Sequence, residues 1–450
     1  MKDKKMPIQK KEPRAESSII AALDIGSSKI CCFIAEVKSP AAGRAAQNIL
    51  GAGRAANIEV IGIGHQASKG VKSGTIIDLR AAETAVAHAV EAAELMARSK
   101  LQDRPIKSVF INVPGMHTLP HPLSVDVRIS GHEVAEKDVK NALSHSRSVV
   151  VPGKEELIHV IPAGYSIDST RGIREPRGMI GQTLGVNITA ITGLAPALRH
   201  LSAVAAQNNL EIDGFCSTPY ASGLASSVGD ELQLGCTVID IGGGTTSIAV
   251  FFEGKVVYSA AIPVGGIHVT NDLARGLLTS VADAERIKTL YGNAHATGID
   301  NGEMIDVPPM GEEEHDQPNY VPRSFITSII QPRIEETFEL VRAKLVDSGI
   351  SQIAGRRAIL TGGASQLPGL CDIGQLILDK KIRLGKPRSI KGLAEATGGP
   401  AFSTTVGLLA YAAEHADEIP SVASGRTFNL PGPLNSPMLQ KVTHWLKENW

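Results

Sequence analysis

The sequence predicts an α/β protein of two related halves that face each other across a phosphate-bearing ligand. The first observation is a repeat: residues 24–28 (DIGSS) and 240–246 (DIGGGTT) share one short pattern. The second is that each copy lies between apolar runs typical of β-strands, which are residues 19–23 and 30–34, and residues 238–239 and 248–252. The third is a length of 450 residues with 43% hydrophobic and 20% charged residues, which suffices for two domains.

Both copies have the residue types that a phosphate site needs. Glycines allow positive φ and close approach of the backbone, so successive N–H groups can converge on an anion. Further donors come from the hydroxyls of Ser27, Ser28, Thr245 and Thr246. Asp24 and Asp240 each stand where a strand ends, a position suited to hold Mg²⁺ through water. One copy alone would more often be an ordinary turn, but the repeat favours two phosphate loops.

A third segment, residues 358–370 (AILTGGASQLPGL), reads as a strand, a turn and the start of a helix. The paired glycines Gly362 and Gly363 would let the backbone lie flat against a ring or a ribose, where a side chain would collide. The sequence contains no GxxxxGK[ST] motif, and no GxGxxG motif follows a strand with an acidic residue beyond it. Neither a P-loop nor a dinucleotide-binding fingerprint is therefore predicted.

These segments occur in the order found in a known superfamily. Further motifs are residues 93–96 (AELM), 159–162 (HVIP), 238–245 (VIDIGGGT), 360–364 (LTGGA) and 405–409 (TVGLL). The chain resembles the actin, Hsp70 and sugar-kinase superfamily and, within it, the FtsA family of bacterial cell-division proteins. The resemblance covers about residues 18–413 and the last fifteen residues. It implies an α/β, actin-like (ribonuclease-H-like, duplicated) two-domain ATPase fold with an inserted α+β SHS2 (1C) subdomain and a C-terminal amphipathic helix.

The resemblance also divides the chain into segments. These are a disordered basic tail (1–17), subdomain 1A (18–82, 181–211 and 393–415), the SHS2/1C insert (83–180), subdomain 2A (212–274 and 326–392), subdomain 2B (275–325), a flexible linker (416–435) and the amphipathic helix (436–450). The residues themselves predict a helix over 75–98, an α+β insert, and a loop at 40–57 to which we assign no function.

The resemblance implies that ATP and Mg²⁺ lie between the two halves. The phosphates and metal would be held by Asp24, Gly26, Ser27, Ser28 and Lys29 from one side and by Asp240, Gly242, Gly243, Gly244, Thr245 and Thr246 from the other. The adenosine would lie against Gly362, Gly363 and Ala364, with Glu285 and Lys288 as further candidates. Lys29 could instead face solvent at the strand edge, and Glu285 and Lys288 equally fit a solvated helix face.

Hydrolysis is predicted to be weak. Proteins of this superfamily that hydrolyse ATP often position water with a Gln or Glu near the domain hinge. The matching stretch here, residues 217–222 (STPYAS), contains neither residue type. We therefore assign no catalytic residue and expect nucleotide to act chiefly on the angle between the domains.

The C-terminal end predicts a contact with lipid. Residues 417–437 contain four prolines and few apolar residues, as in a linker. On the helix that follows, six apolar side chains share one face: Met438, Leu439, Val442, Trp445, Leu446 and Trp450. Both tryptophans of the chain are in this set, which favours the membrane interface over docking of the helix onto its own domain.

The resemblance also implies partners. The polar and acidic residues 293–318 lie in subdomain 2B, which in the FtsA family docks the C-terminal tail of the tubulin-like protein FtsZ; a solvated loop explains the charge equally well. The SHS2/1C insert would contact other divisome proteins, and the chain would contact itself in a filament. A net charge of −1 and the lack of a basic block with aromatics give no reason to expect nucleic acid.

The predicted function is an actin-like, ATP-binding cell-division protein that self-assembles and anchors FtsZ filaments to the cytoplasmic face of the inner membrane at the septum, where it recruits later divisome proteins. As a peripheral membrane protein it would attach through the terminal helix. Two alternatives remain open. A PilM-like scaffold would share the insert and normally lack the terminal helix. A small-molecule kinase of the same superfamily would need a carboxylate facing an acceptor pocket.

Overall fold

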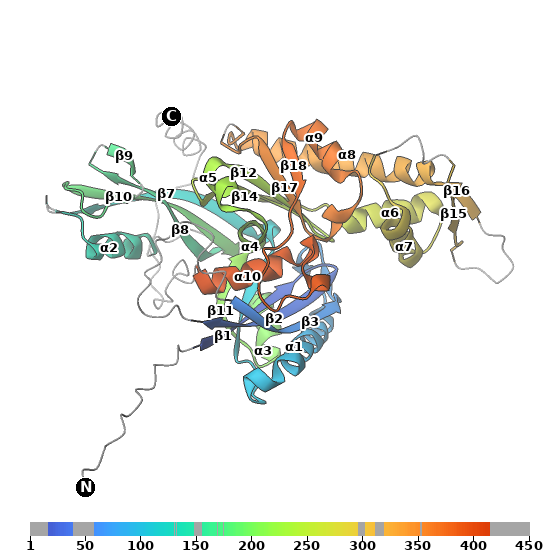
Figure 1. Cartoon of the computed structure of the whole chain (residues 1–450), viewed down its shortest axis with the longest axis horizontal. Helices are drawn as coiled ribbons and strands as arrows, with labels where there is room; N and C mark the ends of the chain where they lie inside the picture. Colours follow the sequence, from blue (N-terminus) through green and yellow to red (C-terminus); the bar gives the residue numbers. More distant parts are fainter. Residues whose placement is uncertain are drawn as a thin grey trace, which may run out of the picture.

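The computed structural model describes residues 17–38, 58–129, 131, 133–147, 155–168, 170–173, 175–295, 302–310, 319–351 and 353–414. Two five-stranded sheets lie at the centre, one above the other in Figure 1, and a smaller sheet extends to one side. The linker and the terminal helix predicted for 416–450, the basic tail and the loop at 40–57 lie outside the described residues. None of the helices in the described part of the chain is both long and apolar enough to cross a membrane.

The first sheet has the strand order β11-β6-β1-β2-β3. Its strands are β1 (Ser17–Ile25), β2 (Lys29–Lys38), β3 (Ile58–Ala67), β6 (Ser108–Val113) and β11 (Glu211–Ser217). Helices α1 (Leu79–Leu101) and α3 (Ala195–Gln207) lie below this sheet in Figure 1. A Cβ on Gly64 would lie 1.9 Å from the carbonyl oxygen of Ala89, so glycines in β3 let α1 approach closely. Helix α1 begins later than predicted, because Asp78 caps it and residues 75–76 form the short strand β5 (Thr75–Ile76) with β4 (Val71–Lys72).

The second sheet repeats the topology of the first. Its order is β14-β13-β12-β17-β18, with β12 (Cys236–Ile241), β13 (Thr246–Phe252), β14 (Lys255–Ile262), β17 (Arg357–Thr361) and β18 (Lys381–Leu384). In each sheet the first strand pairs antiparallel with the second and parallel with a strand from later in the chain. The prediction of two related halves is therefore confirmed.

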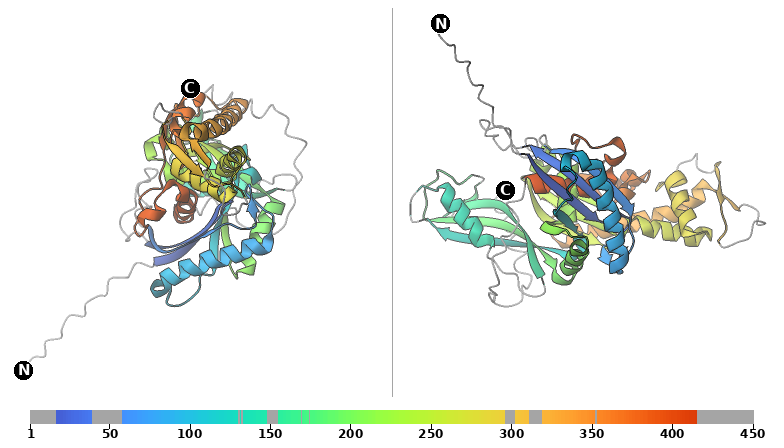
Figure 2. Two further views of the ribbon diagram at one scale, coloured as in Figure 1. Left: turned by 90° about the vertical axis from the view of Figure 1, so that its right-hand side faces the viewer. Right: turned by 90° about the horizontal axis from the view of Figure 1, so that it is seen from below.

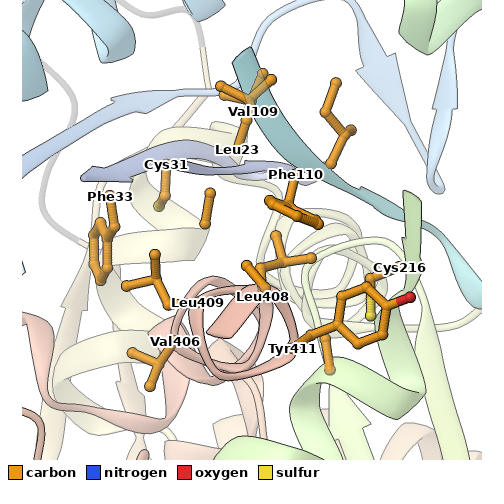
Figure 3. Packing of buried hydrophobic residues seen from close by; sticks show 14 of the residues in the cluster. Leu23, Cys31, Phe33, Val109, Phe110, Cys216, Val406, Leu408, Leu409 and Tyr411 are labelled. Carbon is orange, nitrogen blue, oxygen red and sulfur yellow. The ribbon is translucent and has the colours of Figure 1, made fainter. Parts of the chain in front are cut away.

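Two helices connect the halves. Helix α4 (Thr218–Ser226) follows β11 of the first sheet and leads through α5 (Gly229–Leu234) into β12 of the second. Helix α10 (Ser403–Glu414) returns the chain and packs on the first sheet, where Val406, Leu408 and Leu409 meet residues such as Phe33 (Figure 3). The two helices touch at Gly407, where a Cβ would lie only 1.8 Å from the carbonyl oxygen of Ala221.

The insert is a four-stranded antiparallel sheet in the order β7-β10-β8-β9. Its elements are β7 (Thr118–Arg128), α2 (Glu136–Arg147), β8 (Glu155–Ile167), β9 (Thr170–Ile173) and β10 (Thr183–Leu194), preceded by η2 (Gly115–His117), and it has a separate apolar core. This division differs from the expected 83–180. Helix α1 and strand β6 belong with the first sheet and β10 belongs to the insert, because β6 pairs with β1 and β10 pairs with β7 and β8. Strand β11 likewise stays in the first sheet, beyond the expected start of subdomain 2A at residue 212.

The remaining elements extend the second half at the end of the molecule opposite the insert (Figures 1 and 2). They are α6 (Gly266–Leu277), α7 (Val281–Tyr291), β15 (Met304–Val307), β16 (Asn319–Pro322) and α8 (Arg323–Asp347), with η3 (Gly363–Gln366) and α9 (Leu370–Leu378) nearer the sheet and η4 (Glu395–Thr397) and η5 (Pro400–Phe402) leading into α10. Strands β15 and β16 pair as a hairpin. Part of the acidic stretch 293–318 forms β15, whereas residues 311–318 lie outside the described residues.

Candidate nucleotide-binding site

A cavity of about 160 Å³ lies between the two halves, where β1, β12 and β17 end. All three predicted segments contribute to its wall. The predicted residues that line it are Asp24, Gly26, Ser27, Ser28, Lys29, Asp240, Gly242, Gly243, Gly244, Thr245, Gly362 and Gly363. The two loops nearly touch, since a Cβ on Gly243 would lie 2.8 Å from the Ser28 Cβ. Close approach of the loops therefore depends on glycine at this position.

The two aspartates are buried and held by the helices that connect the halves. Each is only 7% exposed. The Thr405 hydroxyl donates to Asp24 over 3.2 Å, and the hydroxyl of the neighbouring Thr404 donates to Asp240 over 3.1 Å. From α4, the Ser222 hydroxyl also donates to Asp240. Adjacent residues at the start of α10 thus hold one carboxylate from each half.

Burial raises the pKa of both carboxyl groups. The pKa of Asp24 rises to about 6, because burial and the nearby Asp240 disfavour its charge more than Lys29 and the Thr405 hydroxyl favour it. Burial also raises the pKa of Asp240, against hydrogen bonds from Ser222 and Thr404 and the charge of Lys29. Two buried carboxylates side by side form a site of negative potential that a cation would neutralise.

The ammonium of Lys29 points into the wall of the site. Its Nζ donates to the carbonyl oxygen of Ala401 and lies 3.4 Å from the centroid of the Phe402 ring. Lys29 is also close enough to Asp24 and Asp240 to lower the pKa of each. Lys29 therefore lines the cavity with its ammonium held against Ala401 and Phe402, and does not extend into solvent at the strand edge.

Four predicted residues do not line the cavity. The Thr246 hydroxyl instead donates to the carbonyl oxygen of Val264 over 2.8 Å. Lys288 Nζ lies 2.6 Å from a Glu285 carboxylate oxygen and donates to the carbonyl oxygen of Gly266 over 3.2 Å. A Cβ on Gly266 would lie 2.9 Å from that of Ala364. Ala364, Glu285 and Lys288 therefore lie together around Gly266, beside the cavity.

Other parts of the wall come from residues that the motifs did not predict to line it. Residues that line the cavity without having been predicted are Ile25, Gly74, Asn112, Pro114, Thr218, Ser247, Pro400, Ala401 and Thr404. Asn112 accepts from the backbone amide of Ile25 over 2.7 Å and donates to the Thr218 hydroxyl over 3.3 Å. The motif at 405–409 was the one sequence signal near these residues; it begins at Thr405, which holds Asp24 from behind the wall. Asn112 lies within an apolar strand and stands out only once its partners are known.

The described wall of the cavity has few ionisable side chains. Among the described residues that line it, Asp24 and Asp240 are the only carboxylates, and none is Gln, Glu or His. Among the described residues, no group of three or more His, Cys, Asp or Glu side chains is placed to hold a metal ion. Two carboxylates fit Mg²⁺ bound mainly through water and ligand oxygens.

Two halves of repeated topology, with facing glycine loops and an inserted domain, define a protein with an actin-like fold. Solved structures agree on the fold. The PilM–PilN type IV pilus biogenesis complex matches with a TM-score of 0.58 and 18% identity, covering 89% of this chain and 100% of that chain. MreB5 of Spiroplasma citri bound to ADP matches with a TM-score of 0.50 and 15% identity, covering 87% of this chain and 95% of that chain.

Sequence comparisons define the family. The family model for cell division protein FtsA matches residues 237–407, and the model for the SHS2 domain inserted in FtsA matches residues 115–192. Cell division protein FtsA of Rhizobium meliloti is 43% identical over 99% of this chain and 98% of its own length. FtsA of Escherichia coli is 31% identical over 89% of this chain and 91% of its own length. The chain belongs to the FtsA family of cell-division proteins.

Proposed function

We propose that this protein binds ATP with Mg²⁺ between its two halves, assembles with copies of itself, and anchors FtsZ filaments to the inner membrane at the division septum. The observation that carries the nucleotide part is the convergence of two glycine loops and two buried aspartates on one cavity. Membership of the FtsA family supports the role in division. The amphipathic helix that the sequence predicts for residues 436–450 supports the membrane part of the proposal.

The phosphates would occupy the cavity and the nucleoside would extend beyond it. A volume of about 160 Å³ is below the roughly 300–1,000 Å³ of pockets that enclose a whole ligand. Backbone amides and hydroxyls of residues 26–28 and 242–245 would hold the phosphates, and Asp24 and Asp240 would hold Mg²⁺ through water. The nucleoside would pass Gly363 toward Ala364, Glu285 and Lys288, where the paired side chains stand beside the cavity.

We expect turnover well below about 1 s⁻¹, the lower end of ordinary enzyme rates. The reason is that the described wall offers no Gln, Glu or His to position water, and that hydrogen bonds already hold both aspartates. Phosphate release from saturating Mg²⁺–ATP measures the rate, with Asp240→Asn as the background control. A turnover like that of a metabolic kinase, on the order of 10 s⁻¹, would show that a catalytic group has been overlooked.

Subdomain 2B (275–325) offers a surface for the FtsZ tail. Large apolar side chains are exposed on its described part, including Leu278, Val281, Met304, Met310 and Tyr320. The FtsZ tail would dock against such side chains, because removing apolar surface from water favours association. The insert lies at the opposite end of the long axis, so contacts of other divisome proteins with the insert would leave this surface accessible (Figure 1).

Membrane attachment should depend on assembly. At about 1.5–3 kcal/mol for each fully buried large side chain, six partly buried ones provide only several kcal/mol, and ordering the helix offsets much of it. Anionic lipid adds little, since the polar face has two lysines and one glutamate. A single helix would therefore bind reversibly, whereas copies linked in a filament would bind far more tightly through effective concentration.

Co-sedimentation with lipid vesicles tests whether the terminal residues attach this protein, and FtsZ with it, to a membrane. The full chain should bring FtsZ down with the vesicles, whereas a chain truncated after Asn435 should leave both proteins in the supernatant. A matched control is Trp445→Phe, which keeps an aromatic ring in the helix and should retain most of the binding. Vesicle binding by the truncated chain equal to that of the full chain would contradict the role of the helix.

A further inference from the structure

His159 is completely buried at the point where the insert joins the two halves of the molecule. It lies on β8 of the insert. Its ring packs edge-on against Tyr411 of α10, with 5.0 Å between ring centroids, and against Tyr220 of α4, with 5.5 Å. The tyrosine of α10 stands in the core beside Cys216, which precedes α4 in the chain (Figure 3). One side chain of the insert therefore touches both helices that connect the halves.

The hydrogen bonds of His159 determine its tautomer. The backbone N–H of Ser217 donates to Nε2 over 3.0 Å, and an amide nitrogen can only donate. Nε2 is therefore unprotonated, so the ring is neutral and its hydrogen is on Nδ1. That N–H donates to the Tyr411 hydroxyl oxygen over 2.9 Å. The tyrosine orients the ring and the ring holds the residue that begins the turn into α4.

Ser217 leads directly to the cavity. Its hydroxyl lies 3.2 Å from that of Thr118 at the start of β7, so two strands of the insert hold this one residue. The next residue, Thr218, lines the cavity and accepts from Asn112, which in turn accepts from the backbone amide of Ile25 in the first phosphate loop. A continuous chain of short contacts thus runs from the first loop to the insert.

We propose that His159 is a positioning residue that couples occupation of the cavity to the orientation of the insert. This inference rests on the proposed nucleotide site. A ligand that shifts Thr218 moves Ser217, and the buried amide of Ser217 keeps its acceptor only if β8 moves with it, because an unpaired buried N–H is costly. By linkage, if bound nucleotide changes the affinity of the insert for a partner by some factor, that partner changes the affinity of the cavity for nucleotide by the same factor.

Hydrogen–deuterium exchange of the full chain, with and without Mg²⁺ and a non-hydrolysable ATP analogue, tests the coupling. In the wild type, nucleotide should slow exchange in the two loops and also in the hinge ends of β7 and β8, there by about fivefold or more, the low end of ordinary coupling. His159→Gln places an amide oxygen where Nε2 stands and should keep this response. His159→Asn can still donate to Tyr411 but cannot reach Ser217, and should lose the response in the insert while keeping it in the loops.

Thr237→Val is the control for lost stability. It removes a buried hydrogen bond to the carbonyl oxygen of Ala354, away from the insert, and should leave the response intact. If His159→Asn does not fold, Tyr411→Phe replaces it, since it removes the hydroxyl that orients the His159 ring and should weaken the response in the insert. The coupling would be overturned if nucleotide slowed exchange in the insert equally in the Asn and Gln variants. It would also be overturned if nucleotide did not slow exchange in the insert of the wild type. If nucleotide leaves exchange in the loops themselves unchanged in the wild type, the proposed nucleotide site fails and this inference fails with it.

Discussion

Replacing Gly407 with alanine is expected to lower the free energy of unfolding by about 3 kcal/mol or more. The added Cβ would lie 1.8 Å from the carbonyl oxygen of Ala221, and a backbone atom within a packed helix has little room to move. Helices α4 and α10 would have to separate. Because Ser222 and Thr404 on these helices both hold Asp240, nucleotide binding should weaken as well.

Chemical denaturation measures the loss, and Gly276→Ala is a matched control. Gly276 is also helical, but its Cβ would meet the flexible end of Ile329 at 2.7 Å. That side chain can rotate away, and alanine favours a helix by up to about 1 kcal/mol over glycine. The control variant should therefore be neutral or slightly more stable. An equal effect of the two substitutions would show that the contact between α4 and α10 does not control stability.

Replacing Asp24 with asparagine is expected to stabilise the ligand-free protein at pH 7 by about 3 kcal/mol and to abolish stabilisation by Mg²⁺–ATP. The pKa of this buried carboxyl is raised from 3.8 to about 6, so the folded state binds its proton more strongly than the unfolded state. Ionised Asp24 therefore costs stability above pH 6. Below pH 4 the group is protonated in both states and the cost disappears.

The difference in unfolding free energy between this variant and the wild type should thus be largest at pH 7 and shrink to near zero as pH falls from 6 to 4. Denaturation across this range measures it, and thermal shifts with Mg²⁺–ATP measure the loss of binding. Asp306→Asn is the control, because Asp306 is exposed and its substitution should change stability by less than about 0.5 kcal/mol. A variant less stable than the wild type at pH 7 would mean that the carboxylate contributes favourable contacts that outweigh its burial.

Local sequence patterns were enough to place the two loops. A strand, a glycine turn and a second strand involve only neighbouring residues, and DIGSS and DIGGGTT both form this arrangement in the structure. The domain boundaries were harder to predict. From its sequence, strand β6 was assigned to the α+β insert, yet it pairs with β1 and β11 of the first sheet. A strand's own residues do not show which distant strands it will pair with.

Short motifs and the order in which they occur were sufficient to predict the duplicated α/β architecture, the two glycine loops and the family. The groups that complete the site come together through contacts between distant segments. Thr405 holds Asp24 from 381 residues away and Thr404 holds Asp240 from 164 residues away. A buried carboxylate needs a donor close in space at any distance along the chain, so the sequence does not show which carboxylate either threonine holds, even though Thr405 begins a recognisable motif. For the same reason, the sequence of its apolar strand does not single out His159. Its role follows from its contacts with Tyr411 of α10 and with Ser217, which precedes α4.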